Sequence, residues 1–238
     1  MLYAKDTVVF MPARSGSKRI PNKNILKIAG KEMILWPLIE LLKIFPKENI
    51  IVSTDSKFIK NKLKKFNLSN NYIRPKKLAD DYTSTIEVID HVLKWYETNY
   101  SKKKYLLIVY PTAVLLDKKY IIEAFKIMHT SKSLNCVFTA VKYDHPIQRS
   151  FSLDKNHKPN LNNKKFISYR TQDLTKNYHD AGQFYLCKSN DLKKNFSIFS
   201  NSSRAIVLPK NKAIDIDEME DILLADSLLK NNFASRKK

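Results

Sequence analysis

The stretch TVVFMPARSGSKRIPNKN, residues 7–24, joins an apolar run to a loop that is rich in positive charge. The run TVVFMPA has the composition of a buried β-strand. In the loop, Gly16 lets the backbone turn sharply, and several cations can converge on one anion: Arg14, Lys18, Arg19 and Lys23. Cations so close together repel one another, and a bound anion offsets this repulsion. We therefore interpret the stretch as a strand followed by a polyphosphate-binding loop, with a solvated basic loop as the alternative.

Strand-like and helix-like segments alternate along the rest of the chain. Helices are expected over 84–97, where Ser84 and Glu87 form a capping box, and over 118–129, where Asp117 is the expected N-cap. Short β-rich runs lie between the amphipathic stretches, at residues 49–54, 105–110, 136–141, 182–187 and 205–209. This alternation is typical of an α/β fold.

One segment interrupts the alternation. Residues 142–180, KYDHPIQRSFSLDKNHKPNLNNKKFISYRTQDLTKNYHD, are polar, contain proline and show no sustained period. We interpret them as an arm or subdomain inserted into a single domain that spans residues 1–238.

The high positive charge of the chain is compatible with several classes of function. The formal net charge is +20, from 43 Lys and Arg against 23 Asp and Glu. Such a charge suits a nucleic-acid binder, an anionic substrate or a lysine-rich surface without a specific role. Because the lysines are spread in short groups and no RNP, KH or zinc-finger pattern accompanies them, we expect no nucleic-acid partner. A nucleic-acid-binding module is the alternative from a different class.

The apolar runs and the cysteines indicate the compartment. No apolar run approaches the ~20 residues that span a bilayer, and the start lacks the basic and then apolar pattern of a signal peptide. We expect a soluble cytoplasmic protein without a membrane partner. Cys136 and Cys187 lie in strand-like runs without zinc spacing, and we expect them to be buried, reduced thiols.

The glycine count excludes two common phosphate-binding schemes. The chain has only 3 glycines, at positions 16, 30 and 182, so neither GxGxxG nor GxxxxGK[ST] can be written with them. The dinucleotide fingerprint and the Walker loop are therefore absent, and the basic loop must hold phosphates in another way.

The basic loop resembles the signature of the sugar cytidylyltransferases of the sialic-acid class, a strand followed by A-R-x-G-S-K-x-I and then K-N. Ser15 stands where many relatives have a second glycine. Further matching segments follow in the same order and spacing: VSTDS (52–56), RPKKLADDYTST (74–85), YPTAVLL (110–116) and AIDIDEMED (213–221). Within that class, YRTQDLTKNYHDAGQFY (169–185) is similar to the pseudaminic acid cytidylyltransferases.

The resemblance implies a three-layer nucleotidyltransferase (Rossmann-like) fold, with a mixed, mainly parallel sheet and an inserted dimerisation arm. It implies transfer of CMP from CTP to the anomeric hydroxyl of pseudaminic acid, a nine-carbon 2-keto sugar acid, with release of pyrophosphate. Legionaminic and N-acetylneuraminic acid are the alternative substrates. The arm implies a homodimer, because in relatives it pairs with a second subunit.

Positioned cations and Mg²⁺ can stabilise the charge that such a transfer builds on phosphoryl oxygens, without a covalent enzyme intermediate. We assign Arg14, Lys23 and Asp215 to catalysis. In AIDIDEMED, a period of two places Asp215 and Asp217 on the same side, as a pair of Mg²⁺ ligands. Asp217 also precedes Glu220 by three residues, so capping of the next helix is its alternative role.

The resemblance also implies the residues that bind the nucleotide. They are Arg14, Ser17, Lys18, Lys23, Asn24, Arg74, Asp81 and Tyr110, where Tyr110 replaces a glutamine of the N-acetylneuraminate enzymes. A surface arginine is the alternative for Arg74, and we expect Asp55 to be the N-cap of a helix. For the sugar acid, the candidates come from the chemistry of the irregular segment and the motif that follows it, because an arginine fork suits a carboxylate and polar groups suit hydroxyls: Gln148, Arg149, Arg170, Gln172, His179, Asp180 and Gln183. A structural histidine is the alternative for His179.

Overall fold

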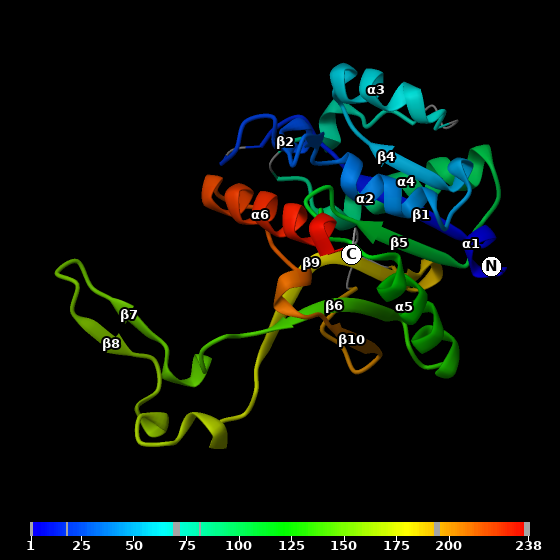
Figure 1. The fold of residues 1–238 in the computed structure, drawn as a ribbon. Helices are drawn as coiled ribbons and strands as arrows, with labels where there is room; N and C mark the ends of the chain where they lie inside the picture. Colours follow the sequence, from blue (N-terminus) through cyan, green and yellow to red (C-terminus); the bar gives the residue numbers. More distant parts are fainter. Residues whose placement is uncertain (1, 18, 69–71, 81, 193–195, 236–238) are drawn as a thin grey trace.

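The computed structural model describes residues 2–17, 19–68, 72–80, 82–192 and 196–235 (Figure 1). Its centre is a 6-stranded sheet in the order β10-β6-β9-β5-β1-β4. The bounds of these strands are β1 Thr7–Pro12, β4 Ile50–Ser53, β5 Tyr105–Val109, β6 Cys136–Lys142, β9 Tyr178–Lys188 and β10 Ser203–Val207. Each strand-like run of the sequence therefore forms a strand of this sheet.

The sheet is mixed, with β9 as its antiparallel member. Strand β1 pairs in parallel with β4 and β5, and β10 pairs in parallel with β6. Strand β9 runs antiparallel between β5 and β6. The register between β6 and β9 shifts between Phe138 and Ala140, so β9 bulges near Gly182. The expected mixed, mainly parallel sheet is confirmed.

Helices cover both faces of the sheet, which gives the expected three layers (Figure 1). On one face α2 (Leu35–Leu42), α3 (Lys57–Leu63) and α5 (Lys118–Thr130) pack against alternate strand residues such as Val9 and Met11. On the other face α4 (Thr85–Asn99) packs against Val8 and Phe10. This division follows from the period of two along a strand.

Both predicted helix starts are confirmed. Ser84 and Glu87 form a capping box at the start of α4. The carboxylate of Asp117 accepts a hydrogen bond from the backbone N–H of Lys119 at the start of α5. In both cases the side chain satisfies an N–H group that has no partner within the helix.

A third apolar cluster lies beside the sheet, at the edge where β1 and β5 end. Here α6 (Met219–Ser235) packs against the hairpin of β2 (Lys27–Ile28) and β3 (Lys31–Glu32). The cluster also contains Ile20 and Ile216. It therefore brings the loop after β1 next to the segment that precedes α6, although almost the whole chain separates them in sequence.

Residues 143–178 project from the body as an arm (Figure 1). The arm contains a hairpin of β7 (Phe151–Leu153) and β8 (Pro159–Leu161), and every residue of these two strands is exposed. The remaining short elements of the chain are α1 Leu2–Lys5 and the 3-10 turns η1 Lys23–Ile25, η2 Lys47–Asn49, η3 Lys64–Phe66, η4 Lys76–Leu78, η5 Ile147–Arg149, η6 Lys164–Phe166, η7 Thr171–Asp173, η8 Ser189–Asp191 and η9 Lys210–Lys212.

The cysteines lie in the core, as expected. Cys136 and Cys187 are opposite each other on β6 and β9, and both are fully buried, free thiols. Among the helices of the described ranges, none combines the length and apolar character that crossing a membrane requires.

Candidate active site

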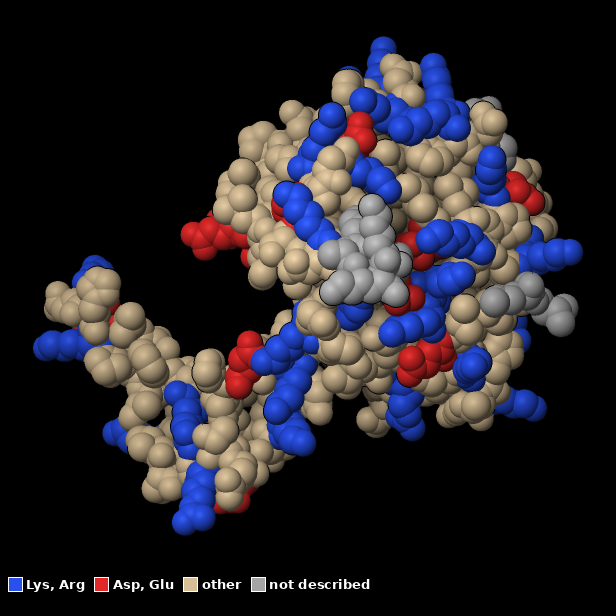
Figure 2. Space-filling model, viewed as in Figure 1, with Lys and Arg blue, Asp and Glu red and all other residues tan. Residues whose placement is uncertain are grey.

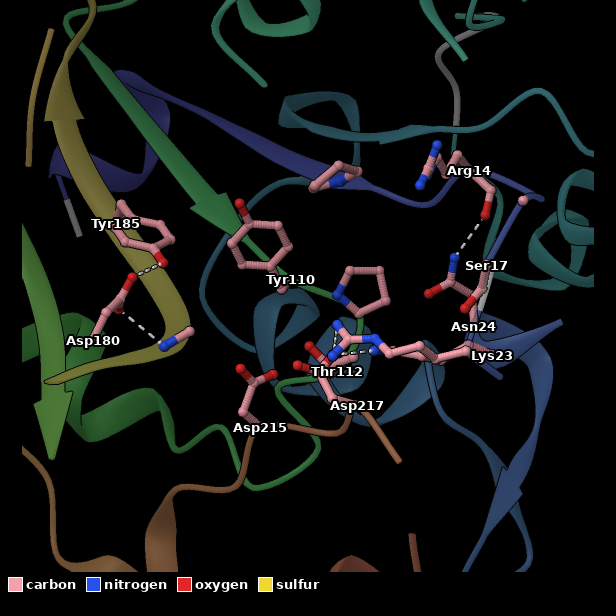
Figure 3. Close-up of a pocket in the computed structure, with 15 residues that line it drawn as sticks. Arg14, Ser17, Lys23, Asn24, Tyr110, Thr112, Asp180, Tyr185, Asp215 and Asp217 are labelled. Atoms are coloured by element: carbon pink, nitrogen blue, oxygen red, sulfur yellow. Dashed lines mark hydrogen bonds and ion pairs between the residues drawn. The ribbon is translucent and has the colours of Figure 1, made fainter. Parts of the chain in front are cut away.

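A cavity of about 600 Å³ opens at the edge of the sheet where β1 and β5 end. Because β9 is antiparallel to β5 and β6, its first residues lie at the same edge. The cavity is lined by side chains from the loop after β1, from residues 110–112, from β9 and from the segment before α6 (Figure 3). In an α/β sheet, this edge is where ligands bind.

Hydrogen bonds give the basic loop a defined path. The N–H of Ala13 donates to the Ser53 carbonyl at 2.8 Å, and Asn24 Nδ2 donates to the Arg14 carbonyl at 2.9 Å (Figure 3). The Arg14 guanidinium donates to the Asp80 carbonyl at 2.9 Å. Ser17 lines the cavity, whereas Lys18 lies outside the described residues.

Asp217 lies between two cations of the loop. Its Oδ1 is 2.6 Å from Arg19 Nη2 and 3.2 Å from Lys23 Nζ. Lys23 also donates to the Ile216 carbonyl. The alternative role of Asp217 as a helix cap is wrong, because among the described residues its carboxylate pairs with these two cations and accepts no backbone N–H. The Asp221 carboxylate accepts the N–H groups of Asp217 and Glu218 instead, at 2.8 and 2.7 Å.

Asp215 is exposed to the same cavity, but its environment differs from that of Asp217. Its side chain makes no hydrogen bond or ion pair with the residues that the structure describes. Desolvation by the cavity walls, together with the nearby charge of Asp217, raises the pKa of Asp215 above its ordinary value. A Cβ atom on Gly182 would lie 3.9 Å from the Asp215 carboxylate, and Gly182 has a φ of +61°. The distance is an ordinary van der Waals contact, so it is the positive φ that favours glycine at this position.

The carboxylate pair fits Mg²⁺ only with help from other ligands. No cluster of at least 3 His, Cys, Asp or Glu side chains with the geometry of a metal site occurs within the described ranges. Mg²⁺ is commonly held by one or two carboxylates, with water and phosphate oxygens completing the octahedron. Asp215 and Asp217 match that donor set.

On the β9 side of the cavity, Asp180 is held by two hydrogen bonds. Its Oδ1 accepts the N–H of Gly182 at 2.9 Å, and its Oδ2 accepts the hydroxyl of Tyr185. The ring of Tyr110 meets that of Tyr185 edge-on, with centroids 5.9 Å apart. Burial raises the pKa of both phenols, so both remain protonated hydrogen-bond donors at neutral pH.

A second cavity of about 260 Å³ adjoins the first and shares Pro12, Arg14 and Tyr110 with it. Arg74 lines this second cavity and is only 5% exposed, so it is not a surface arginine. Its Nε donates to Ser53 Oγ at 3.0 Å, and burial lowers its pKa. Asp81 lies outside the described residues.

Most of the residues predicted to bind the sugar acid lie away from this chain's own cavity. Asp180 lines it, whereas Gln183 is buried and its Nε2 donates to the Lys212 carbonyl at 2.5 Å. The others lie on the arm or at its base: Gln148, Arg149, Arg170, Gln172 and His179.

Within the arm, these side chains differ in what they contact. Arg149 donates to Thr171 and to the carbonyls of Phe166 and Tyr169, so its guanidinium holds the arm together. Gln148 donates to the Thr175 carbonyl, and Nδ1 of His179 lies 2.9 Å from the Asp180 carbonyl oxygen. Among the described residues, the exposed side chain of Arg170 has no hydrogen-bond or ion-pair partner.

Sequence reasoning missed several residues of the site. Thr112 and Tyr185 line the cavity but were assigned no role, and Arg19 was named only as one cation of the loop, although each lies in a segment that carries the resemblance. Asp55 was expected to be a helix cap, and this was wrong. Ser56 caps α3 by accepting the N–H of Ile59, while both oxygens of Asp55 bind Ser15.

The chain is similar to proteins of the cytidylyltransferase family. A family model described as Cytidylyltransferase matches residues 8–233. The pseudaminic acid cytidylyltransferase of Campylobacter jejuni (strain 81-176) is 35% identical over 227 residues, which cover 94% of this chain and 97% of that protein. The N-acylneuraminate cytidylyltransferase of Escherichia coli O18:K1:H7 is 28% identical over 218 residues, covering 92% and 51% of the two chains.

A solved structure shares the fold. The structure of CMP:2-keto-3-deoxy-manno-octonic acid synthetase complexed with CTP matches with a TM-score of 0.65 at 15% identity, covering 96% of this chain and 100% of that one. At such low identity the match speaks for the fold alone. The family model and the relative from Campylobacter jejuni show that this chain belongs to the cytidylyltransferase family.

Proposed function

We propose that this protein transfers CMP from CTP to the anomeric hydroxyl of pseudaminic acid and releases pyrophosphate. The observation that carries the proposal is a cavity that combines a cationic loop, a carboxylate pair and the start of β9. The identity of 35% to a pseudaminic acid cytidylyltransferase over nearly the full length supports the choice of sugar. Legionaminic and N-acetylneuraminic acid are the alternative substrates.

In this proposal the CTP phosphates lie along the basic loop. Arg14, Ser17 and Lys23 reach the cavity from that loop, and Asn24 holds the loop closed through the Arg14 carbonyl. The cytosine enters the adjoining cavity beside Arg74, because this cavity shares Arg14 and Tyr110 with the first. The side chains that bind phosphate and base are thus supplied by neighbouring strand ends.

We propose that Asp215 and Asp217 hold Mg²⁺. Among the described residues Asp215 has no hydrogen-bond or ion-pair partner, and this and its raised pKa both support a cation at this place. When bound, the ion neutralises charge on the phosphate oxygens. The pairing of Asp217 with Arg19 and Lys23 keeps both cations at the wall where that charge lies.

The transfer needs no nucleophile from the protein. The sugar hydroxyl oxygen attacks the α-phosphorus and releases its proton to solvent, a new P–O bond forms, and the bond from the α-phosphorus to the pyrophosphate oxygen breaks. Arg14 and Lys23 are positioned to stabilise the negative charge that grows on the phosphoryl and leaving oxygens. Tyr110 and Asp180, on the opposite wall, are available for the hydroxyl groups of the sugar.

We propose a homodimer in which the arm of one subunit completes the sugar site of the other. The arm exposes large apolar side chains, with Phe151 56%, Leu153 55% and Ile167 53% exposed. Such a surface on a projecting element is typical of an interface. Arg170, which has no partner among the described residues of its own chain, would bind the sugar carboxylate in the partner's cavity. We further propose that the reaction takes place in the cytoplasm, because its substrate is a nucleoside triphosphate.

The test is a coupled pyrophosphate assay with CTP and a panel of 2-keto sugar acids. Pyrophosphate should appear only when both substrates and Mg²⁺ are present, and fastest with pseudaminic acid. A faster reaction with another acid of the panel would change the assignment of the substrate. Release of pyrophosphate without any sugar acid would contradict the proposed reaction.

A nucleic-acid-binding module has no specific observation in its favour. In Figure 2, lysine and arginine side chains are scattered over the body and the arm of the visible face rather than gathered in one groove. A nucleic-acid binder would hold a random oligonucleotide with a steep salt dependence. We expect only weak binding of this kind, measured by fluorescence anisotropy across a range of salt concentrations.

A further inference from the structure

An acidic side chain stands against the basic loop at its first turn. Asp55 follows β4 closely, and its carboxylate uses both oxygens on one loop residue. Oδ1 accepts the backbone N–H of Ser15 at 2.8 Å, and Oδ2 accepts the Ser15 hydroxyl at 2.6 Å. Hydrogen bonds to an ionised carboxylate are about twice as strong as neutral ones. This double contact is the tie between Ser15 and the end of β4.

The position of a negative charge here needs an explanation. A carboxylate beside a site for a polyphosphate repels the ligand and lowers affinity unless it contributes in another way. Partial burial raises the pKa of Asp55, but the hydrogen bonds from Ser15 outweigh it and hold that pKa below its ordinary value. The buried cation of Arg74 also favours the charged form. Asp55 is therefore ionised at neutral pH, and the repulsion is real.

The tie to Ser15 offsets this repulsion of the ligand because it fixes the direction of the loop. On one side of Arg14, the N–H of Ala13 is bonded to Ser53 at the end of β4. On the other side, Ser15 is bonded to Asp55. Both neighbours of Arg14 are thus attached to the same strand end. The next residue, Gly16, is exposed and a Cβ atom there would meet only open space, so packing does not restrict its backbone and the tie at Ser15 is the adjacent restraint.

We propose that Asp55 is a positioning residue for the phosphate-binding loop, and that it acts through Ser15 to hold the loop in the conformation that receives CTP. This inference rests on the proposed use of the loop for the CTP phosphates. The tie removes backbone freedom before the ligand arrives, and such preorganisation increases affinity because less entropy is lost on binding. The positioning role therefore predicts that removing the negative charge of Asp55 weakens the binding of CTP, although CTP is itself an anion.

The two possible roles of Asp55 predict opposite signs. If Asp55 positions the loop, Asp55→Ala should raise the Kd of CTP about 10-fold or more, since two charge-assisted hydrogen bonds are lost. If Asp55 acted only by its charge, Asp55→Ala and Asp55→Asn would both tighten CTP binding. Under the positioning role, Asp55→Asn should have the milder effect, because an amide can still bond both Ser15 groups.

The experiment measures CTP binding by calorimetry and backbone hydrogen exchange of a peptide covering residues 13–20. Ser15→Ala, Asp55→Ala and the double variant form a double-mutant cycle, and we expect losses that are clearly less than additive. Exchange in the peptide should be faster in each variant without ligand. Ser56→Ala is the matched control: it removes the neighbouring cap of α3 and should lower Tm without changing the Kd of CTP.

Unchanged or tighter CTP binding in Asp55→Ala, or strictly additive losses in the cycle, would overturn the inference. If Asp55→Ala does not fold, Ser15→Pro takes its place, because it removes both the hydroxyl and the backbone N–H that Asp55 accepts. An unchanged Kd of CTP in Ser15→Pro overturns the inference equally. Wild-type protein that fails to bind CTP would instead contradict the proposed function, so the two failures are distinguishable.

Discussion

The body and the arm hold their functional side chains in different ways. In the body, Lys23 forms an ion pair with Asp217. Both residues lie close in sequence to a fully buried isoleucine, Ile20 in the loop of Lys23 and Ile216 directly before Asp217. In the arm, Arg149 is held by carbonyls of the same arm, and the strands β7 and β8 bury none of their residues. Core packing positions the first set, whereas local hydrogen bonds position the second.

This difference indicates which half of the site is complete in one chain. Fixed dipoles and charges catalyse best when they are positioned before the substrate arrives, and the residues that we propose to bind the nucleotide meet that condition within the body. A single hairpin is marginally stable in water, and the arm leaves apolar side chains such as Phe151 exposed. We therefore expect the sugar half to depend on a second surface. The following predictions test this contrast, from the largest expected effect to the smallest.

The largest effect should come from the body. Asp215→Asn removes a charge that the proposed metal and phosphates need, so we expect pyrophosphate release to fall about 10³-fold or more. The fold should remain, because the Asp215 carboxylate contacts no described residue through a hydrogen bond or ion pair. Circular dichroism and the coupled assay measure the two properties.

Glu218→Gln is the matched control, since it removes the same charge from an exposed residue of the same segment. Its rate should stay near that of the wild type. Substantial activity in Asp215→Asn would contradict the two-carboxylate proposal and, with it, the view that the body alone completes the nucleotide half.

A mixing experiment tests whether the arm acts in the partner's cavity. Asp215→Asn inactivates the body and leaves the arm intact, whereas Arg170→Glu reverses the charge on the arm and leaves the body intact. Each variant alone should be nearly inactive. After subunit exchange, about half of the dimers should be mixed with one working site each, so about a quarter of wild-type activity should return.

The outcome separates the two arrangements clearly. If the arm served its own chain, mixing would restore nothing, because every chain would then carry either a defective body or a defective arm. Light scattering on each variant, before mixing and after it, shows whether dimers are present.

A smaller effect is expected from Arg170→Lys. The substitution keeps the positive charge but loses the bidentate fork, so the KM for the sugar acid should rise about 10-fold while the KM for CTP stays nearly constant. Arg149→Lys is the contrasting variant, because Arg149 bonds the arm internally. It should lower the melting temperature or the dimer content. Equal changes in both Michaelis constants for Arg170→Lys would indicate a structural role instead.

The sequence predicted the parts of this molecule that depend on local pattern. Apolar runs predicted the strands, and side-chain oxygens at Ser84 and Asp117 predicted two helix starts, because strand alternation and capping are local properties. The basic loop and the Asp215 and Asp217 pair were recognised for the same reason, and the structure brings them to one cavity.

Other features depend on contacts between distant segments. Asp55 looked like a helix cap because Ser15, its partner, lies 40 residues away. Gln183 is a predicted sugar ligand, but it lies in the irregular stretch of β9, is buried, and donates its amide N–H to the Lys212 carbonyl. No periodicity encodes such an irregularity. The sequence pattern also does not show whether the arm reaches the cavity of its own chain or that of the proposed second subunit.

The smallest predicted effect concerns stability and pH in the absence of metal. The pKa of Asp215 is raised above the ordinary value of 3.8 by desolvation and by Asp217. A raised carboxyl pKa favours the folded state while the group is protonated, and this contribution is lost as pH rises through the folded pKa. The amide that Asp215→Asn introduces cannot ionise, so the melting temperature of this variant should exceed that of the wild type by about 1 to 2 °C at pH 8.

This gap should shrink as the pH is lowered towards 3.8, the ordinary pKa of an aspartate, because the wild-type carboxyl then takes up its proton. Saturating Mg²⁺ with CTP should reverse the order, since only the wild type gains the metal. Differential scanning calorimetry at several pH values, with Glu218→Gln as the control, measures both effects. A gap that is independent of pH would show that the Asp215 charge is well solvated in the folded protein, and it would contradict the desolvated environment inferred for this carboxylate in the body.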